Sequence, residues 1–264
     1  MNSLYVYSGT GNTLHIADRI AKELDDCRII NMSTVMGKKV KAEGERVGII
    51  YPVHAFGMPG VVSRFMSNFE VDRSSWVFLV INSAGMPLGT EAQCQSILGK
   101  KGIELKASFA LKMPGNYPPL KNPPSGEKLK KILKKGDSKL EQVVESIKNK
   151  RQSRPSTLFR WVSERINPRA IKEARKGDRV FYNTDSCNSC GVCQAVCPVG
   201  NIVLDKSGHP RWLGKCTGCL SCFHWCPTEA IQYNRTSSLR RNRYHHPDVS
   251  LDRYLKWCKI EQED

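Results

Sequence analysis

The sequence predicts an α/β fold built on a parallel sheet, followed by a small cysteine-rich α+β module. From residue 4 to residue 111, short apolar β-rich runs alternate with amphipathic stretches, which is typical of a parallel sheet covered by helices. Eight of the eleven cysteines then fall between Cys187 and Cys226. The length of 264 residues is also more than one typical domain of ~150 residues. We therefore expect two compact units.

The first unit is expected to span residues 1–150. Five strands are predicted at residues 4–7, 28–31, 47–51, 77–82 and 103–111, with helices at 12–24, 60–69 and 90–100. Five prolines make residues 112–126 irregular. Apolar residues at helical spacing then predict a closing helix, interrupted near Gly136 and Asp137. These apolar residues are Leu129, Ile132, Leu133, Leu140, Val143, Val144 and Ile147.

Residues 151–178 are predicted to form a basic linker with a short amphipathic helix that ends before Pro168. We expect its apolar face to pack between two parts of the same chain. A helix that docks on a membrane surface or a partner is the alternative. The apolar side chains are Leu158, Phe159, Trp161, Val162 and Ile166.

The cysteine module is expected at residues 179–236, and a docking tail at residues 237–264. The tail carries apolar side chains available for packing, namely Val249, Leu251, Tyr254, Leu255 and Trp257.

The cysteines form two copies of one motif, Cys187-x2-Cys190-x2-Cys193-x3-Cys197-Pro198 and Cys216-x2-Cys219-x2-Cys222-x3-Cys226-Pro227. Gaps of two residues allow successive thiolates to wrap one four-iron cubane through a tight turn. The fourth cysteine stands three residues further on, before a proline, and reaches the other cluster. We therefore expect crossed ligand sets: Cys187, Cys190, Cys193 and Cys226 for cluster one, and Cys197, Cys216, Cys219 and Cys222 for cluster two.

A pair of zinc sites is the alternative use of such cysteines. It is disfavoured because zinc has no use for the repeated third cysteine or for the Cys-Pro step. Gly191 and Gly218 also suit a cluster, since backbone amides must approach its sulfides closely. This segment, about a fifth of the chain, resembles bacterial two-cluster [4Fe-4S] ferredoxins.

A hydroxyl-rich and glycine-rich turn follows the first strand and opens a helix. It consists of Ser8, Gly9, Thr10, Gly11, Asn12 and Thr13. Free backbone N–H groups and the helix dipole at such a turn attract a phosphate dianion. The turn lacks the lysine of a P-loop, and its polar side chains favour phosphate binding over an ordinary strand-to-helix turn.

This motif resembles the FMN phosphate loop of flavodoxins, and so does the layout of residues 4–150. The resemblance implies a doubly wound five-stranded parallel sheet with strand order 2-1-3-4-5. It also implies that two further loops enclose the flavin ring: Pro52, Val53, His54, Ala55, Phe56 and Gly57, and Asn82, Ser83, Ala84, Gly85 and Met86. The candidates to stack on the ring are His54, Phe56, Met58, Met86 and Tyr117.

Together the two parts resemble fusion proteins in which a flavodoxin-like domain precedes a two-cluster ferredoxin, including the segment Tyr244-His245-His246-Pro247. The resemblance implies electron transfer between FMN and two [4Fe-4S] clusters, in a soluble carrier or reductase module for a partner redox protein. The alternative is an enzyme whose FMN reduces a quinone or nitro compound. The sequence does not decide between carrier and oxidoreductase, and it identifies no catalytic residue and no second nucleotide motif for NAD(P)H.

Net charge points to a partner of opposite sign. The chain carries +16, and residues 121–180 hold eighteen Lys/Arg against seven Asp/Glu, a surplus of +11. An acidic ferredoxin or flavodoxin, or a downstream reductase, would be attracted by this charge. Nucleic acid is disfavoured because no base-reading module is present.

No apolar run is long enough to span a membrane and no signal sequence precedes the first strand, so a cytoplasmic location is expected. Cys27, Cys94 and Cys258 are expected to be ordinary thiols.

Overall fold

The computed structural model describes residues 1–174, 176–234 and 241–259. Within them, the largest element is a five-stranded parallel sheet. Its strands are β1 (Asn2–Val6), β2 (Cys27–Asn31), β4 (Arg46–Pro52), β6 (Trp76–Ser83) and β7 (Leu105–Lys112). Their spatial order is β2-β1-β4-β6-β7, so β1 lies between β2 and β4. The five predicted strands are confirmed. Outside that prediction lies a short parallel pair, β3 (Val40–Ala42) with β5 (Phe69–Val71), too short to give a readable pattern.

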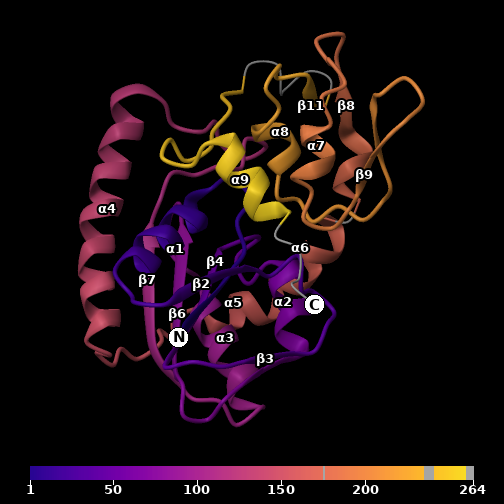
Figure 1. Cartoon of the computed structure of the whole chain (residues 1–264). Helices are drawn as coiled ribbons and strands as arrows, with labels where there is room; N and C mark the ends of the chain where they lie inside the picture. Colours follow the sequence, from indigo (N-terminus) through magenta and orange to yellow (C-terminus); the bar gives the residue numbers. More distant parts are fainter. Residues whose placement is uncertain (175, 235–240, 260–264) are drawn as a thin grey trace.

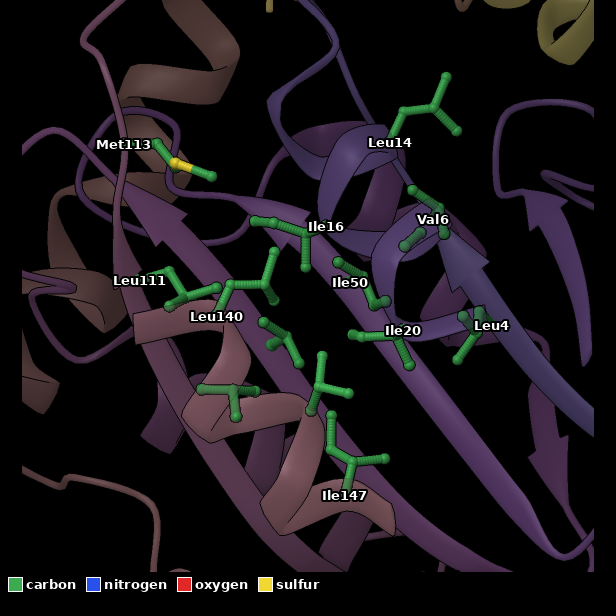
Figure 2. Packing of buried hydrophobic residues seen from close by; sticks show 14 of the residues in the cluster. Leu4, Val6, Leu14, Ile16, Ile20, Ile50, Leu111, Met113, Leu140 and Ile147 are labelled. Carbon is green, nitrogen blue, oxygen red and sulfur yellow. The ribbon is translucent and has the colours of Figure 1, made fainter. Parts of the chain in front are cut away.

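Helices cover both faces of the sheet (Figure 1). On one face lie α1 (Asn12–Lys22) and α4 (Gly126–Lys148), and on the other α2 (Gly60–Ser67) and α3 (Thr90–Gly99). Figure 2 shows the first of these layers, in which Leu4 and Ile50 of the sheet face Ile20 of α1 and Ile147 of α4. Burying each such side chain contributes about 1.5–3 kcal/mol, so the two apolar layers hold the sheet and its helices together.

The closing helix differs from its prediction. α4 runs without interruption from Gly126 to Lys148 and includes Gly136. Glycine inside a helix costs about 1 kcal/mol relative to alanine, but a Cβ at Gly136 would lie 2.8 Å from Met113 Sδ. The predicted interruption near Gly136 and Asp137 is therefore wrong, because the glycine allows the helix to pack closely on the chain that leaves β7.

The linker contains two short helices, α5 (Arg160–Arg165) and α6 (Asn167–Ala174). Pro168 stands in the first turn of α6, where a missing N–H leaves no helical hydrogen bond unmade. Val162 is buried, but Leu158 and Trp161 are 64% and 60% exposed. The expectation that this apolar face packs within the chain is confirmed for Val162 and wrong for Leu158, Trp161 and Ile166, the last of which is 38% exposed.

The cysteine module follows and is built from two antiparallel strand pairs and two short helices. One pair is β8 (Phe181–Asn183) with β11 (Ile231–Tyr233), and the other is β9 (Ile202–Leu204) with β10 (Pro210–Trp212). The helices are α7 (Val192–Ala195) and α8 (Ser221–His224), and a 3-10 turn, η1 (Gly177–Val180), precedes the module. The predicted boundary between residues 236 and 237, and the last residues of the tail, lie outside the described residues.

The end of the chain returns to the first unit. α9 (Leu251–Cys258) lies beside α1 in Figure 1. Val249, Tyr254 and Trp257 are buried in the same apolar cluster as β1 and α1, and Leu251 and Leu255 pack against it. These five side chains of the tail therefore pack in or against the apolar cluster of the first unit. Among the described residues, no helix is both long and apolar enough to cross a membrane.

Candidate functional site

The fold gathers the eight motif cysteines into two groups. Cys187, Cys190, Cys193 and Cys226 line one cavity. Cys197, Cys216 and Cys219 lie near Cys222, which is buried. These groups have the composition of the two predicted ligand sets, and the fourth cysteine of each motif has crossed to the other group. Ligation of metal by these sets stays a prediction.

Several donors point at the sulfur atoms of the second group. The backbone N–H of Asn201 donates to Cys197 Sγ at 3.2 Å, and that of Gly218 donates to Cys216 Sγ at 3.3 Å. The Ser221 hydroxyl donates to Cys219 Sγ at 3.3 Å. Hydrogen bonds to sulfur stabilise negative charge on a cluster and are one of the factors that set its reduction potential.

Burial makes the metal-free thiols reluctant to ionise. It raises the pKa of Cys193 to about 11 and that of Cys216 to about 12. A thiolate is nevertheless the form that binds iron, so loading of these sites must release protons. The arrangement is therefore suited to cysteines whose charge is neutralised by a bound metal.

The two motifs share an unusual backbone. Gly191 and Gly218 have φ of 74° and 68°, and they stand at different positions of the repeat. The equivalent positions in the other copy are Leu220 and Ser189, and both have φ of 59°. Each motif therefore needs two left-handed residues, and each places glycine at one of them. The two glycines are recognisable from the sequence, but the shared conformation of a serine and a leucine is not.

The Ser8–Thr13 loop lies at the carboxyl end of β1 and leads into α1, and all six of its residues are buried. Each polar side chain of the loop is bound within the protein. The contacts are Gly11 N to Ser8 Oγ (3.0 Å), Asn116 Nδ2 to Thr10 Oγ1 (2.5 Å), Tyr244 OH to Asn12 Oδ1 (2.6 Å) and Thr13 Oγ1 to the Tyr7 carbonyl (2.6 Å). Ser8 and Thr10 act as acceptors in these bonds, so their hydroxyl hydrogens, together with other backbone N–H groups of the loop, remain able to donate to a phosphate.

The tail and the cysteine module cover this loop. Trp225 Nε1 donates to the Gly9 carbonyl at 3.0 Å, and the Tyr254 hydroxyl donates to the Ser8 carbonyl at 2.7 Å. A Cβ on Gly9 would stand 3.1 Å from the Cys219 carbonyl oxygen, and one on Gly11 (φ 89°) would stand 3.2 Å from a side-chain carbon of the tail. The loop is thus the place where the two units and the tail meet, a role that its sequence did not reveal.

The other two predicted loops follow β4 and β6 at the same edge of the sheet. Asn167 of α6 donates to the carbonyls of His54 (3.0 Å) and Ala55 (3.2 Å). Desolvation lowers the pKa of His54 to about 4, so this ring is neutral at pH 7. Of the remaining residues, Gly57 and Asn82 are buried, Pro52, Val53 and Ser83 are half-buried, and Ala84 and Gly85 are exposed.

The candidates to stack on a flavin ring differ in exposure, and His54 among them is half-buried. Phe56, Met86 and Tyr117 are 49%, 59% and 53% exposed, so their side chains are open to a ligand. Met58 is fully buried in the core between the sheet, α2 and α3. Met58 is therefore removed from the set of stacking candidates.

A polar cluster that the sequence analysis missed joins α1, α4 and the tail. The rings of His15 and His246 stack with centroids 3.8 Å apart and planes at 18°, and His15 Nε2 lies 3.0 Å from Asp137 Oδ1. These three residues bring possible metal donors together. Because the two rings are nearly parallel, their nitrogen lone pairs do not converge on one point. The stacked rings of His15 and His246 therefore join α1 to the tail, and the contact with Asp137 joins α1 to α4.

Comparison with known proteins assigns the cysteine module. Residues 179–227 match the family model described as a 4Fe-4S dicluster domain. A ferredoxin from Pyrobaculum islandicum is 42% identical over 62 residues, which cover 23% of this chain and 58% of that protein. NAD(P)H-quinone oxidoreductase subunit I from Gloeobacter violaceus is 29% identical over 97 residues, covering 31% and 46% of the two chains. The chain thus spans about half the length of these relatives.

Among solved structures, the Trp repressor binding protein from Bacillus subtilis matches with a TM-score of 0.35 and 12% identity, covering 59% of this chain and 99% of that one. A likeness of this size supports no inference about this chain. The chain contains a 4Fe-4S dicluster domain of the ferredoxin type, joined to an amino-terminal α/β domain with a parallel sheet.

Proposed function

We propose that this protein is an electron carrier that passes electrons between FMN in its amino-terminal domain and two [4Fe-4S] clusters, and exchanges them with a partner redox protein. The carrying observation is the direct contact between the Ser8–Thr13 loop and the backbone at Cys219, where a Cβ on Gly9 would stand 3.1 Å from the Cys219 carbonyl oxygen. An internal electron-transfer route requires this kind of proximity. When bound, FMN supplies one- or two-electron exchange and each cluster supplies one-electron exchange.

Sheet topology supports a ligand at this edge. Counting only the five strands of the sheet in chain order, the arrangement β2-β1-β4-β6-β7 is 2-1-3-4-5, the flavodoxin-like order. Ligands of such sheets bind beyond the carboxyl ends of the strands, where the order reverses. Here that point lies between β1 and β4. Phe56, Met86 and Tyr117 offer open apolar side chains for a flavin ring.

The covered state of the Ser8–Thr13 loop imposes a condition on this proposal. A phosphate would be held by backbone N–H groups at the start of α1, and Tyr244, Val249 and Tyr254 lie over that region. FMN binding and docking of the tail are therefore expected to oppose each other. A variant with a weakened tail contact, Tyr254→Phe, should bind FMN more tightly than the natural chain.

The first experiment measures cofactor content and flavin binding in anaerobically purified full-length protein. About eight iron and eight sulfide per chain are expected from two cubanes. The fluorescence of FMN should be quenched when it binds to the natural chain. Thr10→Asp should quench it more weakly, because the variant places a carboxylate beside the phosphate. The exposed control Thr157→Asp should quench it as the natural chain does. Equal affinity for riboflavin and FMN would contradict the phosphate role. Absence of flavin binding by Tyr254→Phe would remove FMN from the proposal and leave cluster-based transfer.

The partner is proposed to be an acidic redox protein that docks on α4. Lys128, Lys130, Lys131, Lys134 and Lys135 are exposed on this helix. Electrostatic steering of this kind can raise association rates by ~10 to 10³-fold at low salt, and it weakens as the Debye length falls from ~30 Å at 0.01 M to ~10 Å at 0.1 M. Reduction of the clusters by an acidic ferredoxin should therefore slow steeply over this range of salt.

A matched pair of variants isolates the role of α4. Lys134→Glu with Lys135→Glu should flatten the salt dependence, whereas the same change at exposed Lys38 and Lys39, which lie outside α4, should not. Equal behaviour of the two double variants would refute docking on α4. An enzyme that reduces small molecules would instead turn over a quinone or nitro compound without any protein partner. Turnover of such a compound by the isolated protein therefore separates an enzyme from an electron carrier.

A further inference from the structure

Two buried hydroxyl groups beside the second cysteine group have no partner in the described part of the chain. The Tyr7 side chain is fully buried just after β1, and its hydroxyl lies beside the Cys219 thiol and the Thr217 hydroxyl. None of these contacts has hydrogen-bond geometry, and Thr217 Oγ1 also lacks a partner there. Burying a hydroxyl without an acceptor is destabilising. Two such groups beside the same cysteines indicate an acceptor at this place.

A [4Fe-4S] cluster supplies acceptors of the right kind. Its thiolate and sulfide sulfur atoms carry negative charge, and the second group already receives hydrogen bonds from Asn201, Gly218 and Ser221. Tyrosine has an ordinary pKa near 10, so its hydroxyl is a donor at neutral pH. The residues around this group therefore fit the cluster that the domain family implies.

We propose that the Tyr7 hydroxyl donates a hydrogen bond to a sulfur atom of cluster two, so that the amino-terminal domain sets part of that cluster's reduction potential. The inference rests on the proposed ligand set of Cys197, Cys216, Cys219 and Cys222. Tyr7 acts here directly on the cluster, from outside the cysteine module. The cluster accepts one electron from an external reductant, and no proton or covalent bond is exchanged with Tyr7.

The surroundings of Tyr7 hold its hydroxyl at this place. Its ring meets that of His54 edge-on, with centroids 5.8 Å apart, at the loop proposed for the flavin. Two residues further on, Gly9 leaves room for the close approach of the Cys219 backbone. One short segment therefore contacts the cluster-two loop and also faces the proposed flavin site.

The expected effect follows from charge. Reduction makes the cluster more negative, so a hydrogen bond to its sulfur is stronger in the reduced form and raises the reduction potential. Tyr7→Phe keeps the ring and removes only the hydroxyl. We expect it to lower the reduction equilibrium constant of cluster two roughly threefold to tenfold, which is about 28 to 59 mV for a one-electron couple.

Tyr51→Phe is the matched control. Tyr51 is also fully buried, and its hydroxyl also lacks a partner among the described residues. It lies beside Cys94, which is outside both ligand sets. The test is a redox titration of the anaerobic full-length protein, followed by the electron paramagnetic resonance signals of the reduced clusters. Tyr7→Phe should shift one signal to lower potential, and Tyr51→Phe should shift neither.

The outcomes separate the inference from the proposals on which it rests. Unchanged potentials in Tyr7→Phe, or equal shifts of both clusters, would overturn the role of Tyr7. Thr217→Val should shift the same signal in the same direction, and a shift of the other signal would also count against the inference. Cys219→Ala tests the ligand set independently, because alanine offers no ligand atom and full retention of both clusters in that variant would refute the assignment of Cys219 whatever Tyr7 does.

Discussion

Arg243 ties the tail to the cysteine module, and its removal gives a large and specific prediction. Its guanidinium carbon lies 3.4 Å from the centroid of the Phe223 ring. The guanidinium donates to the carbonyl oxygens of Phe223 (2.5 Å), Glu229 (2.7 Å) and Ile231 (2.8 Å). The side chain is 9% exposed, and burial lowers its pKa. These carbonyls flank Cys226, a predicted ligand of cluster one.

The magnitude follows from these contacts. Hydrogen bonds to a charged group are worth about 1.5–3 kcal/mol each, and the cation–π contact adds about 0.5–2 kcal/mol. Three such bonds do not add fully, because desolvation of the guanidinium opposes them. We expect Arg243→Ala to lower the free energy of unfolding of the cysteine module by about 3–5 kcal/mol. Arg243→Lys should cost about half as much, since lysine keeps the charge but not the planar fork of donors.

The assay is the loss of visible iron–sulfur absorption with increasing urea in anaerobic protein. Arg243→Ala should lose its absorption at much lower urea than the natural chain, and the signal of cluster one should disappear first. Arg211→Ala is the control, because Arg211 is 72% exposed and pairs with Asp205 at 3.1 Å, a surface contact worth about 0–1 kcal/mol. If both variants behaved alike, the tail would not support cluster one as argued.

Two further predictions concern the tail and the linker. Burial, aided by His15 and His245, lowers the pKa of His246 to about 3, whereas the unfolded value is near 6.5. The stability due to neutral His246 is therefore complete above about pH 6.5 and falls with pH toward 3, by about 2 kcal/mol between pH 6.5 and 5. Urea unfolding of the natural chain at pH 7 and pH 5 should show this loss of stability, and the loss should be smaller in His246→Gln. A loss of full size in His246→Gln would contradict the assignment of the effect to His246. Separately, Gly89→Ala should release α5, since φ there is 81° and a Cβ would lie 2.5 Å from the Phe159 carbonyl oxygen. Limited proteolysis near residue 157 should then be faster in Gly89→Ala. The control is Gly99→Ala, which has open space around its Cβ and should leave the rate of proteolysis unchanged or lower it. Equal rates in the two variants would show that α5 does not depend on the contact at Gly89.

The parts of the structure that could be predicted from sequence are those set by local patterns. Most of the sheet strands carry a short apolar run, such as residues 77–81 of β6, and the two cysteine motifs carry their own spacing. The course of α4 through Gly136 could not be predicted in this way. It depends on the proximity of Met113, a contact that no local pattern contains.

The candidate site shows the same limit. The Ser8–Thr13 loop has the composition of a phosphate-binding turn, and local reasoning could not indicate what covers it. Tyr254 reaches the Ser8 carbonyl across 246 positions of sequence. The exposure of Trp161 was also hidden, because an amphipathic stripe indicates which side chains share a face and not whether a neighbour covers that face.

The covering of the Ser8–Thr13 loop by the tail also sets a sequence of events during synthesis. The chain emerges from the ribosome at roughly 5–20 residues per second, so Trp257 follows Gly11 after roughly 12–50 s at these rates. During that interval the loop has been made, but the residues that close over it have not. A ligand of the loop can therefore bind without obstruction while the chain is being synthesised. After synthesis, the same ligand must displace the contacts between the loop and the tail.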